Sequence, residues 1–281
     1  MTSTKQYSLL IDCEDAKGLV YKITDLIYRY GLNITLNREF VDNETNHFFM
    51  RTIVDGDLNK DKILEDLSQI LPKNANIRIA SDNKKNVVLL ATKEHHVLGD
   101  LLIRNEFGEI NANILGVISN HEILEPLVQK FNIPFHFISH KGVNREEHEQ
   151  LITQHINEYS PDYLVLAKYM RILNPSFIAP YTNRIINIHH SFLPAFVGAK
   201  PYHQAYERGV KIIGATAHFV NEDLDEGPII TQSTGRINHS HNAETMALMG
   251  KEIESRVLSE ALNLVLEDKV FIHGNKTVIL D

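Results

Sequence analysis

The stretch "RIINIHHSFLP", Arg184 to Pro194, decides the fold of the second half of the chain. Its three isoleucines do not alternate with polar residues, which predicts a strand buried on both faces, as in a parallel sheet. Asn187 and His189 stand at the end of this strand. Burying an amide and an imidazole there costs free energy unless both have partners. Either the two side chains fill a structural hole as a satisfied pair, or they face a cleft.

The surrounding sequence extends the same pattern over residues 86–281. Short apolar strands, among them "VVLLA", "ANILGVIS", "IPFHFIS" and "YLVLA", alternate with helical stretches such as "NREEHEQLITQHINEY". This alternation predicts an α/β domain with a mostly parallel, Rossmann-like sheet covered on both faces. Ligands of such sheets bind beyond the carboxyl ends of the strands. Asn187 and His189 therefore lie where a ligand site is expected.

Residues 1–82 have a different organisation. "YSLLID", "NITLNREFV", "NHFFMRTIVDG" and "NIRIA" predict strands, and two amphipathic segments, the first of them between Gly18 and Gly31, predict helices. The order βαββαβ predicts a small α+β domain, an antiparallel sheet with both helices on one face. The polar stretch "SDNKKN", Ser81 to Asn86, is the expected linker between this domain and the domain of residues 86–281.

Composition restricts the class of function. A chain of 281 residues that is 43% hydrophobic can bury a full core, and its formal charge of −8 opposes nucleic-acid binding. A single cysteine, Cys13, excludes a disulfide framework and a thiolate metal site, and the histidines show no HExxH spacing. No signal peptide and no apolar run of membrane-spanning length is recognisable. A cytoplasmic protein with neither a membrane partner nor a metal is expected.

The residue types at the end of the central strand suit acyl chemistry. Alternation along a strand places Asn187 and His189 on one face and His190 on the other, so the two histidines cannot chelate one metal from an extended strand. An amide offers donors to an oxyanion, and an imidazole moves protons near neutral pH. A carboxylate that orients the imidazole or the attacking water would complete such a site.

Candidate carboxylates lie in the loop "NEDLDEGPII", Asn221 to Ile230. Spacing alone does not choose among its four acids, and a solvated turn is the alternative interpretation. His218 stands just before this loop, where a histidine is more often a packed strand residue than a catalytic one.

The segment from Asn187 to Ile230, with its Asn-x-His, "SFLP" and Asp-x-Gly-x-Ile-Ile elements, resembles the folate-dependent formyltransferase family. The resemblance extends from about Asn86 to the C-terminus. It implies that Asn187, His189 and Asp225 are catalytic and that His218 supports them, and Ser191 is interpreted as a turn residue. It also implies a folate pocket, with core packing as the alternative for its apolar members, formed by Met170, Arg171, Ile172, Leu173, Asp223 and Leu224.

Three features separate this chain from members of the family that formylate an amine on a ribose phosphate. The loop "ATKEHHVLG" lacks the glycines that bring backbone N–H groups onto a phosphate, and His190 replaces a proline. The first half, with "DCEDAKGLVYKITDLIYRYGLNIT", resembles an ACT domain. With these features, the resemblance to an ACT domain followed by a folate-dependent formyltransferase-like domain implies hydrolysis of 10-formyltetrahydrofolate to formate and tetrahydrofolate, without a cofactor. The formate would serve purine synthesis, and the reaction would balance the one-carbon folate pool.

Two other functions stay open at this point: formyl transfer to another small amine, and an inactive sensor of folate and an amino acid. The ACT resemblance implies an amino-acid effector, glycine or methionine, near Gly18 and Asn33. A plain dimerising domain without a ligand is the alternative. Because ACT sheets pair side by side, the resemblance also implies a homo-oligomer, a dimer or a tetramer.

Overall fold

The structure, a computed structural model, describes residues 5–81, 83–194 and 201–281. The chain divides into two compact units. The first comprises residues 1–83 with 267–273 and 278–281, and the second comprises residues 84–266 with 274–277. The two units are described separately.

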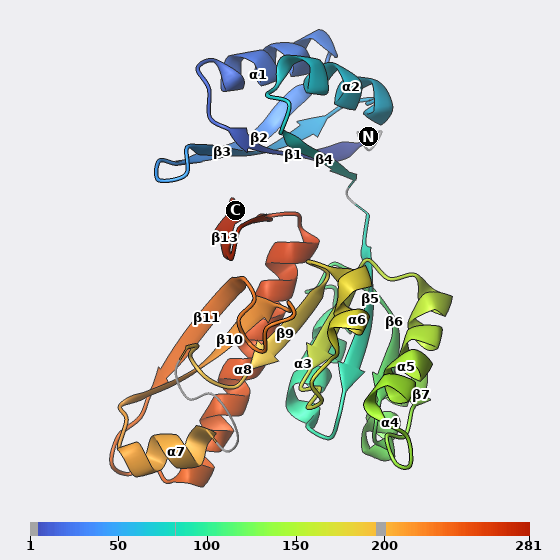
Figure 1. The fold of residues 1–281 in the computed structure, drawn as a ribbon, viewed down its shortest axis with the longest axis vertical. Helices are drawn as coiled ribbons and strands as arrows, with labels where there is room; N and C mark the ends of the chain where they lie inside the picture. The colour runs from blue at the N-terminus through green and yellow to red at the C-terminus, as the bar shows by residue number, and fades with distance from the viewer. Residues whose placement is uncertain (1–4, 82, 195–200) are drawn as a thin grey trace. The chain divides into compact units, whose positions relative to one another are not determined.

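The first unit is a four-stranded antiparallel sheet covered on one face by two helices (Figure 1). The strand order β2-β3-β1-β4 and the βαββαβ succession confirm the predicted α+β fold. Its elements are β1 (Gln6–Glu14), α1 (Leu19–Arg29), β2 (Asn33–Asp42), β3 (His47–Asp55), α2 (Lys60–Ile70) and β4 (Asn76–Ser81).

Local sequence explains where these helices begin and what they bury. Gly18 precedes α1 with φ +87°, a left-handed conformation that glycine adopts without the steric cost of a Cβ. The helix then buries its apolar stripe, which includes Leu19, Ile23 and Leu26, against the sheet. Asn59 caps α2 by accepting a hydrogen bond from the backbone N–H of Lys62.

The other face of this sheet carries residues from the C-terminus of the chain. Phe271 and Leu280 are buried in one cluster with Leu10 and Phe49. Arg51 donates hydrogen bonds to the backbone carbonyls of residues 267 and 268. The sequence predicts one domain over residues 86–281, but residues 267–273 and 278–281 group with the first unit, because this apolar contact lies there.

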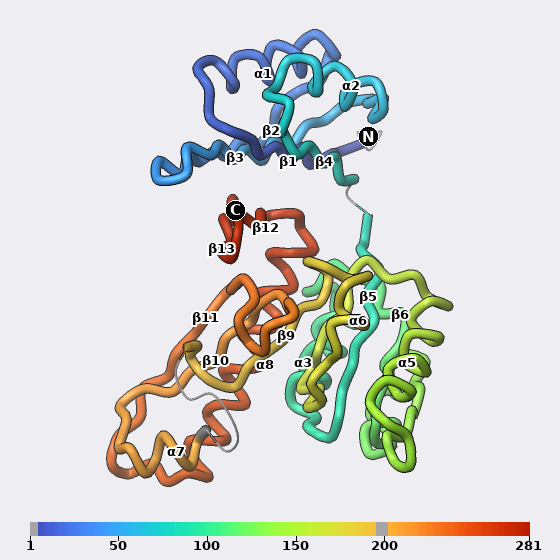
Figure 2. The backbone as a smooth tube through the Cα atoms, viewed as in Figure 1, coloured from blue at the N-terminus to red at the C-terminus, as the bar shows by residue number. Residues whose placement is uncertain are grey.

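The second unit is built on a seven-stranded sheet of order β11-β10-β9-β8-β5-β6-β7. Its elements are β5 (Lys85–Ala91), α3 (His95–Glu106), β6 (Ala112–Ser119), η1 (Glu122–Leu124), α4 (Glu125–Val128), η2 (Gln129–Phe131), β7 (Phe135–Phe137), α5 (Arg145–Tyr159), β8 (Tyr163–Ala167), α6 (Pro175–Ile178), η3 (Ala179–Tyr181), β9 (Ile185–His189), α7 (Pro201–Arg208), β10 (Ile212–Phe219), β11 (Ile229–Arg236) and α8 (Ala243–Leu266). The hairpin β12 (Val270–His273) and β13 (Lys276–Ile279) ends the chain, and Figure 2 traces α8 directly into it.

Five neighbouring strands, β9-β8-β5-β6-β7, run parallel, and β10 and β11 add an antiparallel edge. The predicted α/β class with a mostly parallel sheet is therefore confirmed. Helix α8 packs along β9, β10 and β11 beside α3, while α5 and α6 contribute to a core on the other face of the sheet. The chain passes from β5 to β6 on one side and later to β8 on the other, so β5 and β8 flank a topological switch point.

In the ranges that the structure describes, none of the helices is long and apolar enough to cross a membrane.

Candidate active site

Asn187 and His218 face each other across two antiparallel strands. They are register partners of β9 and β10, and Asn187 Nδ2 lies 3.2 Å from His218 Nε2. The other ring nitrogen of His218, Nδ1, lies 2.8 Å from the carbonyl oxygen of Phe219. A carbonyl only accepts, so Nδ1 carries the proton and Nε2 accepts from the amide. His218 thereby fixes which end of the Asn187 amide is the donor.

His189 ends β9 and contacts the acidic loop. Its Nδ1 lies 3.3 Å from Asp225 Oδ2, and Asp225 Oδ1 lies 3.7 Å from His218 Nε2. The other ring nitrogen of His189, Nε2, is buried and has no hydrogen-bond partner among the described residues. Buried polar atoms usually have a partner, and among the unpartnered histidine nitrogens of the described chain this is the one that belongs to a residue lining the cavity. The ring is thus held at Nδ1, and Nε2 is left without a protein partner among the described residues.

The electrostatics of Asp225 follow from these contacts. Burial alone would raise the pKa of this carboxyl, but its contact with His189, and with His218 when that ring carries a second proton, outweighs burial and holds the pKa well below its ordinary value. Asp225 is therefore an anion throughout the physiological range, so it accepts the Nδ1–H of His189 and leaves Nε2 as the unprotonated nitrogen of the ring.

The backbone of the loop between β10 and β11 is shaped to present this carboxylate. Asp225 has φ +58°, a left-handed conformation that is uncommon for a residue with a side chain. Two residues on, a Cβ on Gly227 would lie 1.8 Å from the carbonyl oxygen of Phe219, so only glycine fits. From outside the loop, Asn275 Nδ2 donates to the carbonyl of Glu226 at 2.9 Å.

The turn after β9 is fastened to β10 and β11. Thr216 Oγ1 donates to the carbonyl of Ser191 and accepts from the backbone N–H of Leu193. Gln232 Nε2 donates to Thr216 Oγ1 and to the carbonyl of Leu193. This arrangement is consistent with Ser191 as a turn residue.

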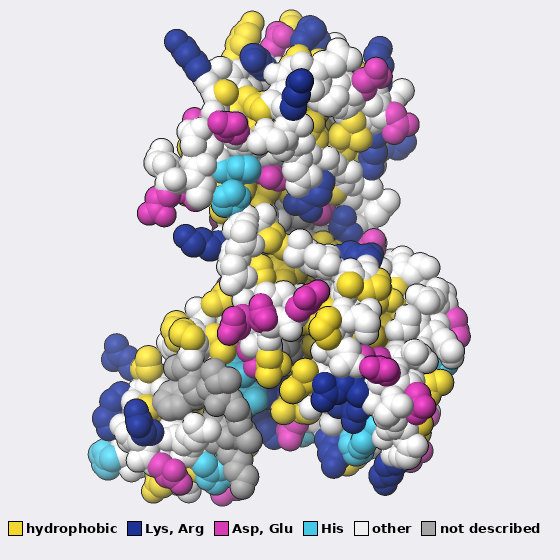
Figure 3. All heavy atoms as spheres, in the orientation of Figure 1, with side chains coloured by type: hydrophobic (Ala, Val, Ile, Leu, Met, Phe, Trp, Pro, Cys, Tyr) yellow, Lys and Arg dark blue, Asp and Glu magenta, His cyan; other side chains and the backbone are white. Residues whose placement is uncertain are grey.

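Asn187, His189, His218 and Asp225 all line one cavity of about 540 Å³. On the face seen in Figure 3, hydrophobic side chains border a recess in which histidine side-chain atoms are visible. Exposed apolar side chains in a concave site are typical of a ligand pocket. All six residues that the sequence analysis placed in the folate pocket line the cavity: Met170, Arg171, Ile172, Leu173, Asp223 and Leu224.

Two further cavity residues, Lys168 and His190, have no predicted role in the sequence analysis. Lys168 Nζ pairs with Glu254 Oε2 at 3.2 Å, and Glu254 also bonds with His96 and Tyr202. No sequence signal marked this set, because its members come from four separate segments and Glu254 stands in an ordinary helical pattern. His190 was visible only as a departure from the family pattern.

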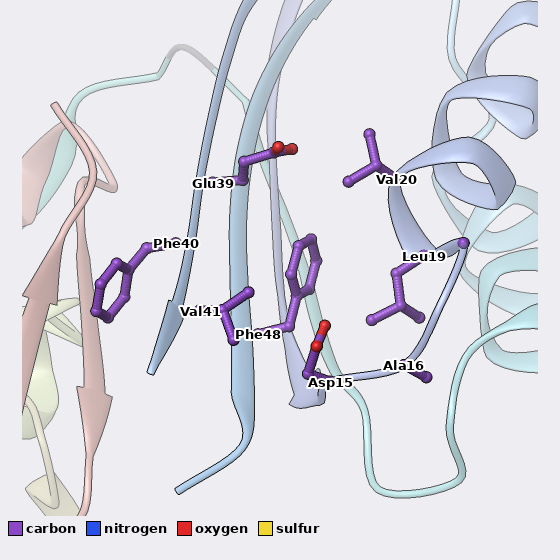
Figure 4. A pocket seen from close by; sticks show the side chains of 9 residues that line it. Asp15, Ala16, Leu19, Val20, Glu39, Phe40, Val41 and Phe48 are labelled. Carbon is purple, nitrogen blue, oxygen red and sulfur yellow. The ribbon is translucent and has the colours of Figure 1, made fainter. Parts of the chain in front are cut away.

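The first unit has a cavity of its own, of about 460 Å³. Figure 4 shows the carboxylates of Asp15 and Glu39 beside the space between β2 and the start of α1, with apolar side chains that include Leu19 and Phe48 around it. Gly18 belongs to the lining. The structure does not bring Asn33 to this cavity: it is exposed at the start of β2.

The described part of the chain contains no group of three or more His, Cys, Asp or Glu side chains that could hold a metal ion.

Comparison with family models assigns residues 85–262 to the formyl transferase family and residues 7–72 to the ACT domain family. The chain is 56% identical to the formyltetrahydrofolate deformylase of Haemophilus influenzae, over 97% of this chain and 98% of the relative. It resembles the crystal structure of a formyltetrahydrofolate deformylase from Pseudomonas syringae with a TM-score of 0.95 at 38% identity, covering 100% of this chain and 96% of that one.

Residues of this chain also match a glycinamide ribonucleotide transformylase structure from Symbiobacterium toebii, at 29% identity and a TM-score of 0.68. That match covers 95% of the transformylase but only 70% of this chain.

Proposed function

Because the chain belongs to the formyltetrahydrofolate deformylase family, we propose that it hydrolyses 10-formyltetrahydrofolate to formate and tetrahydrofolate. The observation that carries the proposal is the joint position of Asn187, His189 and Asp225 at the cavity beyond the carboxyl ends of β8 and β9. An amide donor, an imidazole with an open nitrogen and a buried carboxylate are the groups that hydrolysis of a formyl amide needs.

His189 acts first as a base. Its Nδ1–H is held by Asp225, so Nε2 presents a lone pair to the cavity. Nε2 takes a proton from water while the water oxygen bonds to the formyl carbon, and the carbonyl π electrons move to oxygen. The resulting imidazolium is stabilised by the Asp225 carboxylate.

Asn187 stabilises the tetrahedral intermediate. One N–H of its amide is directed to His218, and the second is free to donate to the oxyanion. The C–N10 bond then breaks, and Nε2–H of His189 returns the proton to N10 of the leaving folate. Formic acid is released and ionises to formate, so atoms and charges balance without a metal or a nucleophilic side chain.

The cavity supports folate as the ligand. Met170, Ile172 and Leu224 are apolar and half or more exposed, which suits the flat pterin ring and keeps bulk water from the reacting carbon. Arg171 also lines the cavity and is placed to pair with an anionic group of the substrate.

Incubation of the protein with 10-formyltetrahydrofolate alone tests the proposal. We expect stoichiometric formate and tetrahydrofolate without any added acceptor. Asn187→Ala should lower kcat by about a hundredfold or more, with folate binding retained, because one oxyanion donor is lost. Formate release that requires an added amine would instead indicate a formyltransferase. Tight folate binding with no turnover would indicate a sensor.

We also propose that the cavity of the first unit binds an amino-acid effector, glycine or methionine. The start of α1 offers backbone N–H groups to a carboxylate, and Asp15 and Glu39 offer partners to an ammonium group. The apolar lining favours methionine, because glycine has no side chain to bury there.

Calorimetric titration of the full-length protein with each amino acid, in parallel with formate release, tests effector binding. Gly18→Val should weaken binding because a β-branched side chain does not tolerate φ +87°. Binding of neither amino acid would leave the first domain as a dimerising module, which sedimentation would reveal as a dimer or tetramer.

The cellular role is proposed from the reaction. Its products are formate, which purine synthesis can use, and free tetrahydrofolate, which returns to the one-carbon pool. A cytoplasmic location is proposed with it, and fractionation of cells that express the protein would test it.

A further inference from the structure

A buried carboxylate, Glu254, lies behind the catalytic residues. It belongs to α8, and only 1% of its surface is exposed. Oε2 lies 2.8 Å from His96 Nε2 and 3.2 Å from Lys168 Nζ, and Oε1 accepts a hydrogen bond from the Tyr202 hydroxyl at 2.7 Å. Burial would raise the pKa of Glu254, but these three partners lower it to about 2. Glu254 is thus an anion that holds the ammonium of Lys168 in one place.

Lys168 is the first residue after β8 and has an unusual backbone. Its φ is +60°, a left-handed conformation that a residue with a side chain adopts only at some cost. The residue is only 8% exposed, yet it lines the same cavity as Asn187 and His189. A strained backbone that carries a buried cation to a substrate cavity indicates a functional role, since ordinary packing would not require either feature.

His190 stands next to this cation. Its ring centroid is 5.0 Å from that of His189, with the two planes 23° apart, and it lines the same cavity. Burial and then the charge of Lys168 lower the pKa of His190 to about 4. Its imidazole is therefore neutral at physiological pH, with a nitrogen lone pair available to water.

We propose that Lys168 and His190, here called the Lys168–His190 wall, make water the acceptor of the formyl group by excluding amines. The inference rests on the proposed function and deepens it. Small primary amines are mostly cations near neutral pH, and the fixed ammonium of Lys168 opposes their approach at this wall, whereas the carboxylates of the cavity, Glu222, Asp223 and Asp225, belong to the loop between β10 and β11. Water carries no charge and can donate to neutral His190 beside Nε2 of His189.

The alternative reaction that the wall prevents is chemically balanced. An uncharged amine would bond to the formyl carbon, lose a proton to His189 and displace tetrahydrofolate, which takes that proton at N10. The products would be a formylated amine and tetrahydrofolate. The catalytic residues serve both outcomes, so the choice of acceptor has to come from other groups in the cavity.

The test follows the fate of a ¹³C-labelled formyl group in the full-length protein. The substrate is 10-formyltetrahydrofolate with glycinamide as a cationic amine, and NMR quantifies [¹³C]formate and N-formylglycinamide. We expect wild type to yield formate alone. Lys168→Met removes the charge and keeps the length of the side chain. It should raise the ratio of formylated amine to formate by about tenfold or more.

Three further variants make the test specific. Lys168→Arg keeps the charge and should keep the wild-type ratio. Lys251→Met removes a lysine of α8 that pairs with Glu94 at the surface, and it should also leave the ratio unchanged. Lys168→Met leaves Glu254 buried without a countercharge and can therefore destabilise the protein. The double variant Lys168→Met/Glu254→Gln removes both charges, and it replaces the single variant in the test if the single variant unfolds at a much lower temperature than wild type.

Each result is decisive. A wild-type ratio in Lys168→Met and in the double variant overturns the inference, and so does loss of turnover in both without any formylated amine. The inference is also overturned if the wild-type protein gives the same ratio of formylated amine to formate as Lys168→Met does. Wild type that releases no formate refutes the proposed function itself, an outcome distinct from an unchanged ratio in variants of an active hydrolase.

Discussion

Two buried carboxylates in the second domain, Asp225 and Glu254, have similar electrostatics and different surroundings. Both have a pKa below its ordinary value because basic partners outweigh burial. Asp225 lies in a loop with φ +58° and contacts His189, whose Nε2 has no partner in the described chain. Glu254 lies within the longest helix and has partners at both of its oxygens.

The comparison separates a carboxylate at a ligand cavity from a carboxylate whose own two oxygens are both satisfied. Such a buried ion pair is costly to disturb. His96 Nδ1, in the cluster around Glu254, also has no hydrogen-bond partner among the described residues, but neither His96 nor Glu254 lines the cavity. The cluster around Asp225 retains one unused nitrogen at a cavity, which a water or substrate group can bond. Substitutions at Asp225 should therefore change turnover most, and substitutions at Glu254 should change stability most.

Asp225→Asn is expected to give the largest effect. The amide can still contact His189 but does not stabilise an imidazolium, so kcat should fall by about 10²–10⁴-fold. Formate release measures the loss, and equilibrium binding of tetrahydrofolate should remain close to wild type. Turnover within a few-fold of wild type would show that Asp225 has no catalytic role.

Glu254→Ala should act mainly on folding. Removing the carboxylate leaves the ammonium of Lys168 buried without a partner, so the free energy of unfolding should fall by about 3–5 kcal/mol. Urea denaturation measures this change. Lys251→Ala is the matched control, because its pair with Glu94 is solvent-exposed and should contribute about 0–1 kcal/mol. Equal losses from the two variants would contradict the distinction between a buried network and a surface pair.

The pH dependence of stability should show two steps. His190 has a folded pKa of about 4 against an ordinary 6.5, so the unfolded chain binds the extra proton between these values. Stability should therefore fall as pH falls from 6.5 to 4, by at most about 1.4 kcal/mol per pH unit from this residue. His190→Asn should flatten that interval in urea titrations, and an unchanged slope would contradict a neutral His190.

The second step lies at lower pH and comes from the carboxylates. Glu254 has a folded pKa of about 2 against an ordinary 4.5, so its contribution is present above pH 4.5 and is lost as pH falls toward 2. Asp225 is shifted in the same direction. Glu254→Gln should remove part of this acid-induced loss and leave the interval above pH 4.5 as in wild type.

Asn275→Ala should give the smallest effect. Its side chain donates one hydrogen bond to the carbonyl of Glu226, next to Asp225. Loss of an exposed bond of this kind should lower the free energy of unfolding by about 0.5–1.5 kcal/mol. Because Asp225 retains its contacts with both histidines, kcat should fall much less than it does in Asp225→Asn. A fall in kcat as large as that of Asp225→Asn would show that the conformation of the loop depends on this hydrogen bond.

Prediction from sequence worked where a local pattern carried the information. The apolar run ending at Asn187 and His189 indicated a strand of a parallel sheet, and β9 pairs with β8 in parallel. The six residues expected to bind folate came from two contiguous segments with recognisable motifs; both segments line one cavity, and folate binding there stays a prediction. The βαββαβ order of the first domain likewise follows from periodicities that are local in the chain.

Prediction failed to anticipate what depends on distant segments. The burial of Phe271 and Leu280 with Leu10 and Phe49 joins the two ends of the chain, and no local pattern marks it. Asn33 was expected beside Gly18, but its place at the start of β2 leaves it outside the cavity of the first unit.

The sequence by itself determined the two fold classes, the family and the polar residues at the end of the central strand, since each depends on residue types at fixed spacing along the chain. Only the tertiary structure decided which of the four loop acids reaches His189, how His218 orients the Asn187 amide, and that Lys168 enters the cavity from its pair with Glu254. The physical reason is that these contacts depend on side chains far apart in sequence, whose distances are set by strand register and helix packing.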